Sequence, residues 1–396
     1  MTTATELDTA DPLAESRELF IRADGVVAYL DGNSLGRPLK VSVDRIAAFL
    51  ESQWGGRLIR GWDESWMALP GRIGDDLGRI AIGAAPGQTT VGDSTTVLLY
   101  KLIRAAASAR PARTEIVVDR DNFPTDRYIV EGIAAELGMT VVWIDAGDAL
   151  TAEAVADVIG PNTAVVVLSH IAYRSGYIAD AAAITAVSHE AGALVVLDLC
   201  HSVGVVPVEL DAWKVDLAVG CTYKYLNGGP GAPAFAYVRS ELQAELRQPI
   251  QGWIGSAAPF EMGQGYEPAA GIRGFLSGTP PIVGMLAMQD MIALIDAVGL
   301  PAVRAKSIAL TAFAIELSDG LLPDAVLATP RDPAFRGSHI TLDHPRFAQL
   351  VPRLWAHGVI PDFRRPSGLR LGLSPLSTSF AEVEAGIRAI AEEMAG

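Results

Sequence analysis

The amino-acid sequence predicts an α/β protein with a large, mostly parallel sheet covered by helices and a smaller α/β domain at its C-terminal end. Several short runs are apolar at every position, as in strands buried on both faces of a parallel sheet. These runs alternate with helix-like stretches between residues 115 and 197, which is typical of βαβ units. The length of 396 residues exceeds one ordinary domain.

The βαβ units follow one another in chain order. Strands are expected over 115–118, 140–144, 164–168 and 193–197, and helices over 127–137, 152–159 and 181–191. Two prolines, Pro280 and Pro281, then precede an apolar helical stretch, and a further strand is expected over 338–342. We therefore expect a large domain over 47–279 and a small domain over 280–396, with the N-terminal segment 1–46 packed against the small domain.

Composition and charge exclude several classes of protein. Half of the residues are apolar and the formal net charge is −15, which disfavours nucleic acid as a partner. No stretch approaches the roughly 18 uninterrupted apolar residues of a membrane span, and residues 1–8 lack the start of a signal peptide. The histidines are scattered, and Cys200 and Cys221 form no C-x-x-C pair, which argues against metal sites and disulfides. We expect a cytoplasmic protein with no membrane partner.

An acid and a lysine stand at the ends of two apolar strands. Asp198 ends the run 195–198, and Lys224 is the only one of five lysines that lies between an apolar strand and a glycine turn. Pyridoxal phosphate requires an amine that holds its aldehyde as a Schiff base and a carboxylate that keeps its ring nitrogen protonated. The two residues fit these roles, although an apolar strand ending in Asp and a solvated lysine are each common in α/β proteins.

A turn rich in small hydroxyl residues offers a seat for a phosphate group. It leads into the apolar helix-like stretch 97–103, and a helix start presents unpaired N–H groups and a positive dipole end. Ser94, Thr95 and Thr96 would add hydroxyl donors. The alternative interpretation is an ordinary Asp or Ser N-cap.

Two other segments carry candidate site residues. Pro124 pins a loop directly after a buried strand, where Phe123 could lie flat on a pyridine ring and Asp126 could accept a hydrogen bond. Near the C-terminus, Arg370 is a single charge inside an apolar run. Because an apolar strand seldom carries an unpaired charge, Arg370 should meet a carboxylate, either of a substrate or of an internal salt bridge.

Six segments together resemble kynureninase, in the order of that family and over nearly the whole chain. They are LDGNSLG at 30–36, VGDSTT at 91–96, NFPTD at 122–126, DLCHS at 198–202, GCTYKYLNGGPG at 220–231 and SGTPP at 277–281. The resemblance implies the fold-type I pyridoxal phosphate-dependent transferase fold of the class V aminotransferase superfamily. That fold has a mostly parallel seven-stranded sheet in the large domain and a smaller α/β C-terminal domain. The resemblance also implies a homodimer with shared active sites.

The resemblance further implies roles for individual residues. Lys224 would bind the cofactor aldehyde, and Asp198 would pair with the pyridine nitrogen. Further cofactor contacts are implied for Ser94, Thr95, Thr96, Phe123, Asp126, Tyr173, His201, Tyr223 and Trp253, with Thr279 arriving from a partner subunit. Substrate contacts are implied for Asn33, Ser34, Trp62, Ile254, Ser256 and Arg370, where Arg370 would hold the α-carboxylate.

The implied reaction is hydrolysis of the Cβ–Cγ bond of L-kynurenine, or of a ring-substituted relative such as 3-hydroxykynurenine, to an anthranilate and L-alanine. This reaction belongs to the kynurenine pathway of tryptophan catabolism and NAD biosynthesis, or to secondary metabolism. Lys224 would remove the α-proton, and Tyr223 would donate a proton to Cβ.

The sequence departs from the family's pattern at four positions. The family usually has an aromatic residue at Ile254, a histidine at Ser256 and an alanine at Cys200, and Arg273 lies one position earlier than expected. Ile254 and Ser256 would change the shape and hydrogen bonding around the substrate's aromatic ring. A modified kynurenine is therefore a plausible substrate.

Two other classes of function remain open. An aminotransferase or cysteine desulfurase of the same fold would share Asp198 and Lys224, but a desulfurase needs a mobile catalytic cysteine, and neither Cys200 nor Cys221 lies in a suitable loop. A non-catalytic binding protein of this fold is disfavoured by the complete set of cofactor residues. Visible absorbance from a bound cofactor would separate a binding protein that lacks the cofactor from an enzyme.

Overall fold

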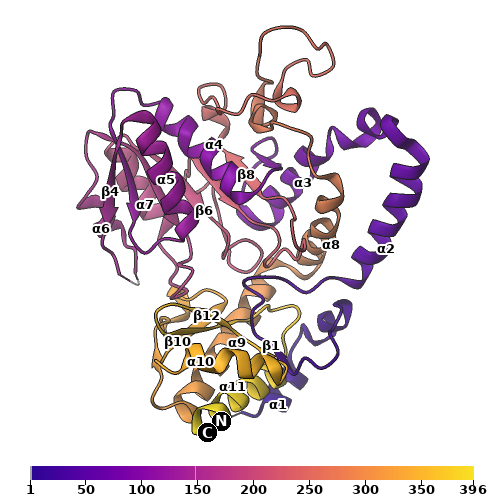
Figure 1. The fold of residues 1–396 in the computed structure, drawn as a ribbon, viewed down its shortest axis with the longest axis vertical. Coiled ribbons are helices and arrows are strands. Elements are labelled where there is room, and N and C mark those ends of the chain that lie inside the picture. The colour runs from indigo at the N-terminus through magenta and orange to yellow at the C-terminus, as the bar shows by residue number, and fades with distance from the viewer. Residues whose placement is uncertain (1, 148) are drawn as a thin grey trace.

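The computed structural model of the chain describes residues 2–147 and 149–396. Figure 1 shows a larger body with a central sheet above a smaller body, and an arm (residues 40–60) that contains α2 (Lys40–Ala48) and projects to one side. Both ends of the chain lie on the smaller body.

The large sheet has seven strands in the order β2-β8-β7-β6-β5-β3-β4. Only β8 runs antiparallel to its neighbours; the other pairings are parallel. The strands are β2 (Thr89–Val91), β3 (Glu115–Asp119), β4 (Thr140–Ile144), β5 (Thr163–Ser169), β6 (Leu194–Asp198), β7 (Leu217–Gly220) and β8 (Phe235–Val238). This mostly parallel seven-stranded sheet confirms the predicted fold class.

Helices cover both faces of the large sheet because alternate strand residues serve two separate cores. In β3, Val117 packs into one core, whereas Ile116 and Val118 pack into the other. The first core includes side chains of α3 (Leu69–Leu77), α6 (Ala152–Ala156), α7 (Ala181–Glu190) and α8 (Ile282–Val298), and the second includes α4 (Thr95–Ser108) and α5 (Pro124–Leu137). The runs in β3, β5 and β6 are thus buried on both sides, as the sequence predicted, whereas the run in β4 lies at the sheet edge and is mostly half-buried.

The smaller body contains an antiparallel sheet in the order β12-β13-β10-β9. Its strands are β9 (Val326–Leu327), β10 (His339–Asp343), β12 (Asp362–Arg364) and β13 (Gly368–Gly372). Helices α9 (Leu300–Leu321), α10 (Phe347–Ala356) and α11 (Phe380–Ala395) share one apolar core with this sheet.

The N-terminal segment joins the smaller body. Helix α1 (Ala4–Ala10) packs on α11, and β1 (Ala28–Tyr29) pairs in parallel with β11 (Val359–Ile360). The segment then continues into the arm, where α2 (Lys40–Ala48) packs against α8. The domain limits at residues 46/47 and 279/280 stay a prediction, because α8 sends its buried side chains into a core of the large sheet.

Among the residues that the structure describes, no single helix is long and apolar enough to cross a membrane. Helices α8 and α9 reach that length and composition only as a pair, and the pair is bent by 91°.

We expect the buried ion pair between Asp11 and Lys306 to fasten the N-terminal segment to α9. The Lys306 ammonium is 4% exposed and also lies 4.1 Å from the centre of the Phe380 ring. Asp11→Ala should lower the free energy of unfolding by roughly 3 kcal/mol, because it leaves a buried charge without its partner. Burial lowers the pKa of Lys306, and the variant has lost the acid that raised it. The folded variant therefore releases this proton at a lower pH than the unfolded chain does, so the loss of stability should shrink as the pH rises. Denaturant unfolding at several pH values measures both effects.

The matched control replaces both partners. Asp11→Leu with Lys306→Met should recover most of the lost stability, because no buried charge remains. Equal stability of Asp11→Ala and the wild-type chain would show that the pair does not hold the segment.

Candidate active site

The site lies at the carboxyl edge of the large sheet, where parallel strands bring their following loops together. Ser169 at the end of β5 pairs in register with Asp198 at the end of β6. One step later, the Leu199 N–H donates to the Val219 carbonyl of β7 at 2.8 Å, which aligns the two loops that carry Asp198 and Lys224. The position of the predicted acid and lysine thus follows from the strand register.

Lys224 contacts a neutral histidine. Its Nζ lies 3.2 Å from Nε2 of His201 and 5.9 Å from the ring centres of Phe123 and Tyr223. Burial, followed by the charges of Lys224 and Arg370, lowers the pKa of His201 well below its usual value. The imidazole is therefore uncharged near neutral pH and can accept a hydrogen bond from the lysine ammonium.

Two buried carboxyl groups face the same cluster. Asp198 Oδ1 accepts a hydrogen bond from the Cys200 N–H at 2.7 Å. Asp126 is 1% exposed, and burial, followed by the charge of Asp198, raises its pKa well above the usual value. Its Oδ2 has no hydrogen-bond partner among the described residues. This buried oxygen could therefore form a hydrogen bond with a bound ligand.

The phenol of Tyr223 stays protonated. Burial, followed by the neighbouring Cys221 and Cys200 thiols, raises its pKa far above the usual value. A protonated phenol next to Lys224 in the chain can serve as a proton donor.

Arg370 is 1% exposed and is held by three separate segments. It donates from Nη1 to the Tyr173 carbonyl at 2.8 Å and from Nη2 to Ser34 Oγ at 2.8 Å. Its Nη2 also lies 2.7 Å from Asp362 Oδ2 and 4.0 Å from Asp31 Oδ1. The internal salt bridge that the sequence left open is thus present, and contact with a substrate carboxylate stays a prediction.

The other residues of this cluster are joined through Arg370 and Phe123. The Asn33 amide lies against the same guanidinium, with its oxygen 3.0 Å from Arg370 Nε in the amide orientation that satisfies both groups. The Tyr173 ring packs edge-on against Phe123 at 5.3 Å between centres. Asn33, Ser34 and Tyr173 are therefore brought to the same place as Lys224.

The predicted phosphate seat forms a helix start, but the described contacts do not join it to Lys224. Ser94 Oγ accepts from the Val97 N–H at 3.4 Å, so Ser94 caps α4 as the alternative interpretation proposed. Ser94 and Thr96 are exposed, and Thr95 is partly exposed. Their contact with a phosphate stays a prediction.

The predicted ring-pocket residues lie in a second, aromatic cluster. The Trp62 ring packs 6.4 Å from Trp253, which in turn packs 6.0 Å from Phe260. Ile254 is 1% exposed, and its carbonyl accepts from Nη1 of Arg273 at 3.1 Å. The described contacts connect this cluster to neither Arg370 nor Lys224.

Two more predicted residues lie outside the Lys224 cluster. Ser256 Oγ accepts from the Ala258 N–H at 3.4 Å, and Thr279 is exposed. A role for either residue stays a prediction.

Sequence reasoning missed three residues at the site. His339 of β10 lies 5.5 Å from His201 between ring centres, and Asp362 of β12 pairs with Arg370. Ser169 donates to Asn122 Oδ1 at 2.7 Å, next to the Phe123 loop. The sequence could have indicated Ser169, because it ends a buried strand of the large sheet. His339 and Asp362 come from the smaller body, and no sequence pattern indicated them.

The cluster fits pyridoxal phosphate. It offers an amine for the aldehyde, buried carboxyl groups for the ring nitrogen and an aromatic ring for stacking, and Asp126 Oδ2 is a buried acceptor without a partner among the described residues. Within the described parts of the chain, no group of three or more His, Cys, Asp or Glu side chains is placed to hold a metal ion.

Two family profiles match the sequence. The profile described as "Aminotransferase class-V" matches residues 83–343, and the profile described as "Kynureninase C-terminal domain" matches residues 303–390. The chain is 41% identical to a kynureninase of Pseudomonas fluorescens over 395 residues, covering 98% of this chain and 93% of the relative. It is 42% identical to a kynureninase of Burkholderia pseudomallei strain K96243, covering 96% and 92% of the two chains.

Solved structures confirm the fold. A cysteine desulfurase of Thermococcus onnurineus NA1 matches with a TM-score of 0.83 at 18% identity, covering 96% of this chain and 97% of the other. A variant of C-DES with glycine covalently linked to its PLP cofactor matches with a TM-score of 0.83 at 18% identity, covering 95% and 99%. At this identity the likeness concerns the fold alone.

We expect Asp126→Asn to remove a loss of folding stability that the buried Asp126 carboxyl group causes as the pH rises. Because the folded-state pKa of Asp126 is raised, the folded chain binds a proton that the unfolded chain releases, so wild-type stability falls as pH rises. The variant lacks this term. Its free energy of unfolding relative to wild type should therefore increase as the pH rises above about 4, by up to roughly 1.4 kcal/mol per pH unit. Denaturant unfolding of the cofactor-free protein measures this difference.

Asp121→Asn is the matched control, because Asp121 is an exposed acid on the same loop. Parallel pH profiles for Asp126→Asn and the wild-type protein would contradict a raised pKa at Asp126.

Proposed function

The chain belongs to the kynureninase family of pyridoxal phosphate-dependent enzymes, and we propose that it hydrolyses the Cβ–Cγ bond of L-kynurenine or a ring-substituted kynurenine to an anthranilate and L-alanine. The observation that carries the proposal is 41% identity to a kynureninase over 98% of the chain. The cluster of Lys224, His201 and the two buried acids supports it.

Pyridoxal phosphate, when bound, supplies an aldehyde for the substrate's amine and a ring that takes up the electron pair left on carbon. Asp198 holds a proton at the ring nitrogen in this proposal, since it is buried at the end of β6 and faces the cluster. Phe123, whose ring centre lies 5.9 Å from Lys224 Nζ, would stack on the ring.

Lys224 moves the proton at the substrate's Cα. His201 positions the lysine amine through the 3.2 Å contact and, being neutral, adds no competing charge. Tyr223 donates a proton to Cβ once the Cβ–Cγ bond is broken, since its phenol stays protonated up to high pH. Water adds to the γ-carbonyl, so the products are a carboxylic acid and an amino acid.

Arg370 and Ser34 hold the substrate's α-carboxylate. The two side chains already contact each other, and Arg370 keeps a fixed direction because the Tyr173 carbonyl and Asp362 hold the guanidinium. A fixed guanidinium loses little freedom when it binds a carboxylate.

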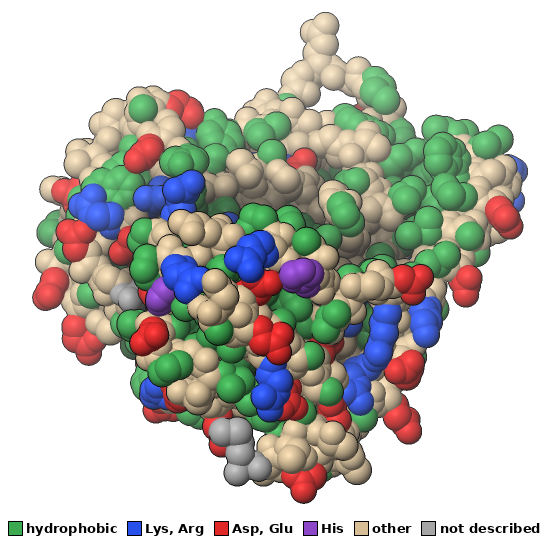
Figure 2. Space-filling view, turned by 60° about the horizontal axis from the view of Figure 1, so that its bottom comes forward, with side chains coloured by type: hydrophobic (Ala, Val, Ile, Leu, Met, Phe, Trp, Pro, Cys, Tyr) green, Lys and Arg blue, Asp and Glu red, His purple; other side chains and the backbone are tan. Residues whose placement is uncertain are grey.

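A homodimer is part of the proposal, with the partner subunit's Thr279 reaching the phosphate. The arm supports pairing, because apolar side chains gather on it in Figure 2 and six of them are exposed: Val41, Val43, Leu50, Trp54, Leu58 and Ile59. A groove of about 290 Å³ between the arm and the start of α8 adds further apolar surface. Exposed apolar patches of this kind mark protein interfaces. The cytoplasmic location expected from the sequence stays a prediction.

We expect Lys224→Ala to abolish turnover, because the change removes both the amine that binds the aldehyde and the base for the α-proton. A loss of about 10³-fold or more is expected for a residue with two such roles. Fluorescent anthranilate and alanine released from L-kynurenine and L-3-hydroxykynurenine measure it. Lys40→Ala, at an exposed lysine, is the control. A Lys224→Ala enzyme that keeps a tenth of the activity would sink the assignment.

We expect a charge on the arm to separate the subunits and lower activity. Trp54→Asp should shift the protein toward monomers in sedimentation velocity, because it places a carboxylate in an apolar contact. Trp355→Asp is the control, since Trp355 in α10 is 53% exposed and Trp54 is 54% exposed. If Trp54→Asp is a fully active monomer, or the wild-type chain is one, the shared active site is wrong.

We expect Ile254 and Ser256 to set the preference for the substrate's ring. Loss of an aromatic residue opens space, so the wild-type enzyme should favour a substituted ring by roughly 10- to 200-fold in kcat/KM. Ile254→Phe with Ser256→His should return the preference toward L-kynurenine. If L-kynurenine is already preferred and the double variant leaves the ranking unchanged, these two residues do not read the ring.

A further inference from the structure

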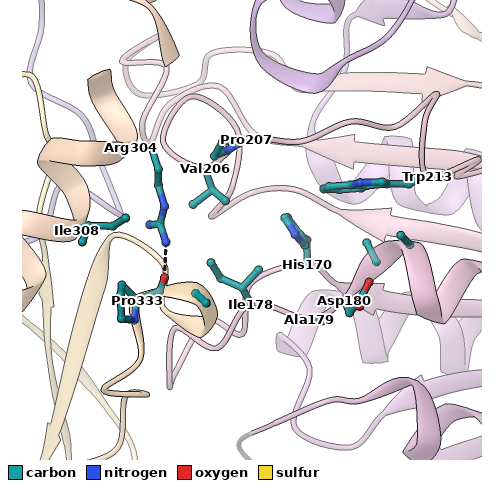
Figure 3. Close-up of a pocket in the computed structure, with 13 residues that line it drawn as sticks. His170, Ile178, Ala179, Asp180, Val206, Pro207, Trp213, Arg304, Ile308 and Pro333 are labelled. Atoms are coloured by element: carbon teal, nitrogen blue, oxygen red, sulfur yellow. Dashed lines mark hydrogen bonds between the residues drawn. The ribbon is translucent and has the colours of Figure 1, made fainter. Parts of the chain in front are cut away.

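A cavity of about 420 Å³ lies between the two bodies of the protein. Figure 3 shows side chains from both bodies converging on it, with Ile178 and Trp213 from segments of the large sheet and Arg304 and Ile308 from α9. This volume falls within the range of about 300–1,000 Å³ that is usual for sites of small molecules.

The cavity is lined by the Arg304 guanidinium, which has no carboxylate partner among the described residues. Arg304 Nη2 donates to the carbonyls of Pro333 at 2.6 Å and Arg336 at 2.8 Å, and Nη1 reaches Ser307 Oγ at 3.4 Å. Among the described residues, the partners of this guanidinium are these two carbonyls and one hydroxyl, and no carboxylate pairs with it. Burial, followed by the charge of Arg336, lowers the pKa of Arg304 to about 10. A bound anion would offset both effects.

The remaining polar groups restrict that anion to one charge. Asp180 also lines the cavity, but its Oδ1 accepts from the Ala183 N–H at 2.9 Å and caps α7. Figure 3 places Asp180 and Arg304 on opposite sides of the cavity, so a second anionic group on a ligand would face a carboxylate. His170 is neutral near pH 7, because burial lowers its pKa to about 4. Its ring packs 5.3 Å from Trp213, beside the apolar walls.

We propose that this cavity is a binding site for a small aromatic monocarboxylate, whose carboxylate pairs with Arg304 and whose ring packs between Ile178, Val206 and Ile308. The apolar lining packs against the ring, and the Arg304 guanidinium, which has no carboxylate partner among the described residues, pairs with the negative charge. Anthranilate belongs to this class, but the site itself does not depend on the proposed reaction.

An occupant would touch segments that continue into the active site. His170 Nδ1 is hydrogen-bonded to Ser202 Oγ at 2.8 Å, and Ser202 directly follows His201. On the other side, the turn that carries Pro333 meets the large-sheet body, where the Ile178 N–H donates to the Phe335 carbonyl at 2.9 Å. The ligand would therefore bridge the two bodies at their seam.

Calorimetric titration of the cofactor-loaded protein with benzoate tests the site. Benzoate should bind at millimolar concentration or below, and neutral benzamide should bind at least about tenfold more weakly. Arg304→Gln removes the charge, and Ile308→Trp keeps the charge but fills the cavity. Each should weaken benzoate binding by about 10- to 150-fold, with thermal unfolding confirming that both variants are folded.

Ser34→Ala distinguishes this cavity from the active site, where a carboxylate could also bind. The change removes one of the two side chains proposed to hold the α-carboxylate and leaves Arg370 its contacts with the Tyr173 carbonyl and Asp362. Benzoate affinity should be unchanged in that variant. The proposal is overturned if millimolar benzoate does not bind, if benzamide binds equally well, if Arg304→Gln or Ile308→Trp keeps wild-type affinity, or if Ser34→Ala removes the binding.

Discussion

The buried guanidinium of Arg370 is the constraint around which the site is assembled. It is 1% exposed, so its hydrogen bonds must be satisfied inside the protein. Its partners come from three places: Ser34 in the N-terminal segment, the Tyr173 carbonyl in a loop of the large sheet, and Asp362 in the small sheet. A charge that none of these segments could bury alone thus fixes their relative positions. The same contacts bring the Tyr173 ring against Phe123, beside Lys224.

The second constraint is electrostatic. Asp126 and Asp198 are buried beside the half-buried Lys224, and the nearest histidine is kept neutral by burial and by the charges of Lys224 and Arg370. Because burial and the charge of Asp198 raise the pKa of Asp126, the cluster can hold a proton on Asp126. Such an arrangement costs stability in the empty protein and suits the binding of a cationic ring nitrogen.

Much of the large body could be predicted from the sequence, because short local patterns of apolar residues mark its strands and helices. Apolar runs marked buried strands, and residues that end such strands, such as Asp198, had to meet at one edge of a parallel sheet. Contacts between the bodies could not be predicted in this way. His339 sits in an ordinary-looking strand, and it lies beside His201 only because the small sheet docks there. Asp362 lies directly opposite Arg370 in the register of β12 and β13. No local sequence pattern predicted that register. The positions of Trp62 and Ile254 relative to Lys224 could not be predicted from the sequence either, because each lies in a short helical turn far from Lys224 in the chain.

The structural likeness to cysteine desulfurases shows that the fold does not determine which reaction the protein catalyses. A TM-score of 0.83 at 18% identity shows that closely similar backbones can be built from largely different sequences, and a shared fold does not by itself fix the reaction. Desulfurase chemistry needs a cysteine that can move to its substrate, whereas Cys200 and Cys221 are buried in packed segments just past β6 and β7. The Cys221 N–H donates to Cys200 Sγ at 3.2 Å, and contact with Cys221 together with burial raises the pKa of Cys200. A buried thiol with a raised pKa, such as Cys200, is a poor nucleophile. Cys221 differs, because its contact with Cys200 and the charge of Lys224 outweigh burial and lower its pKa, but its side chain is only 1% exposed. Neither cysteine therefore has the mobility that desulfurase chemistry needs, and the contact between them packs together the loops that follow β6 and β7.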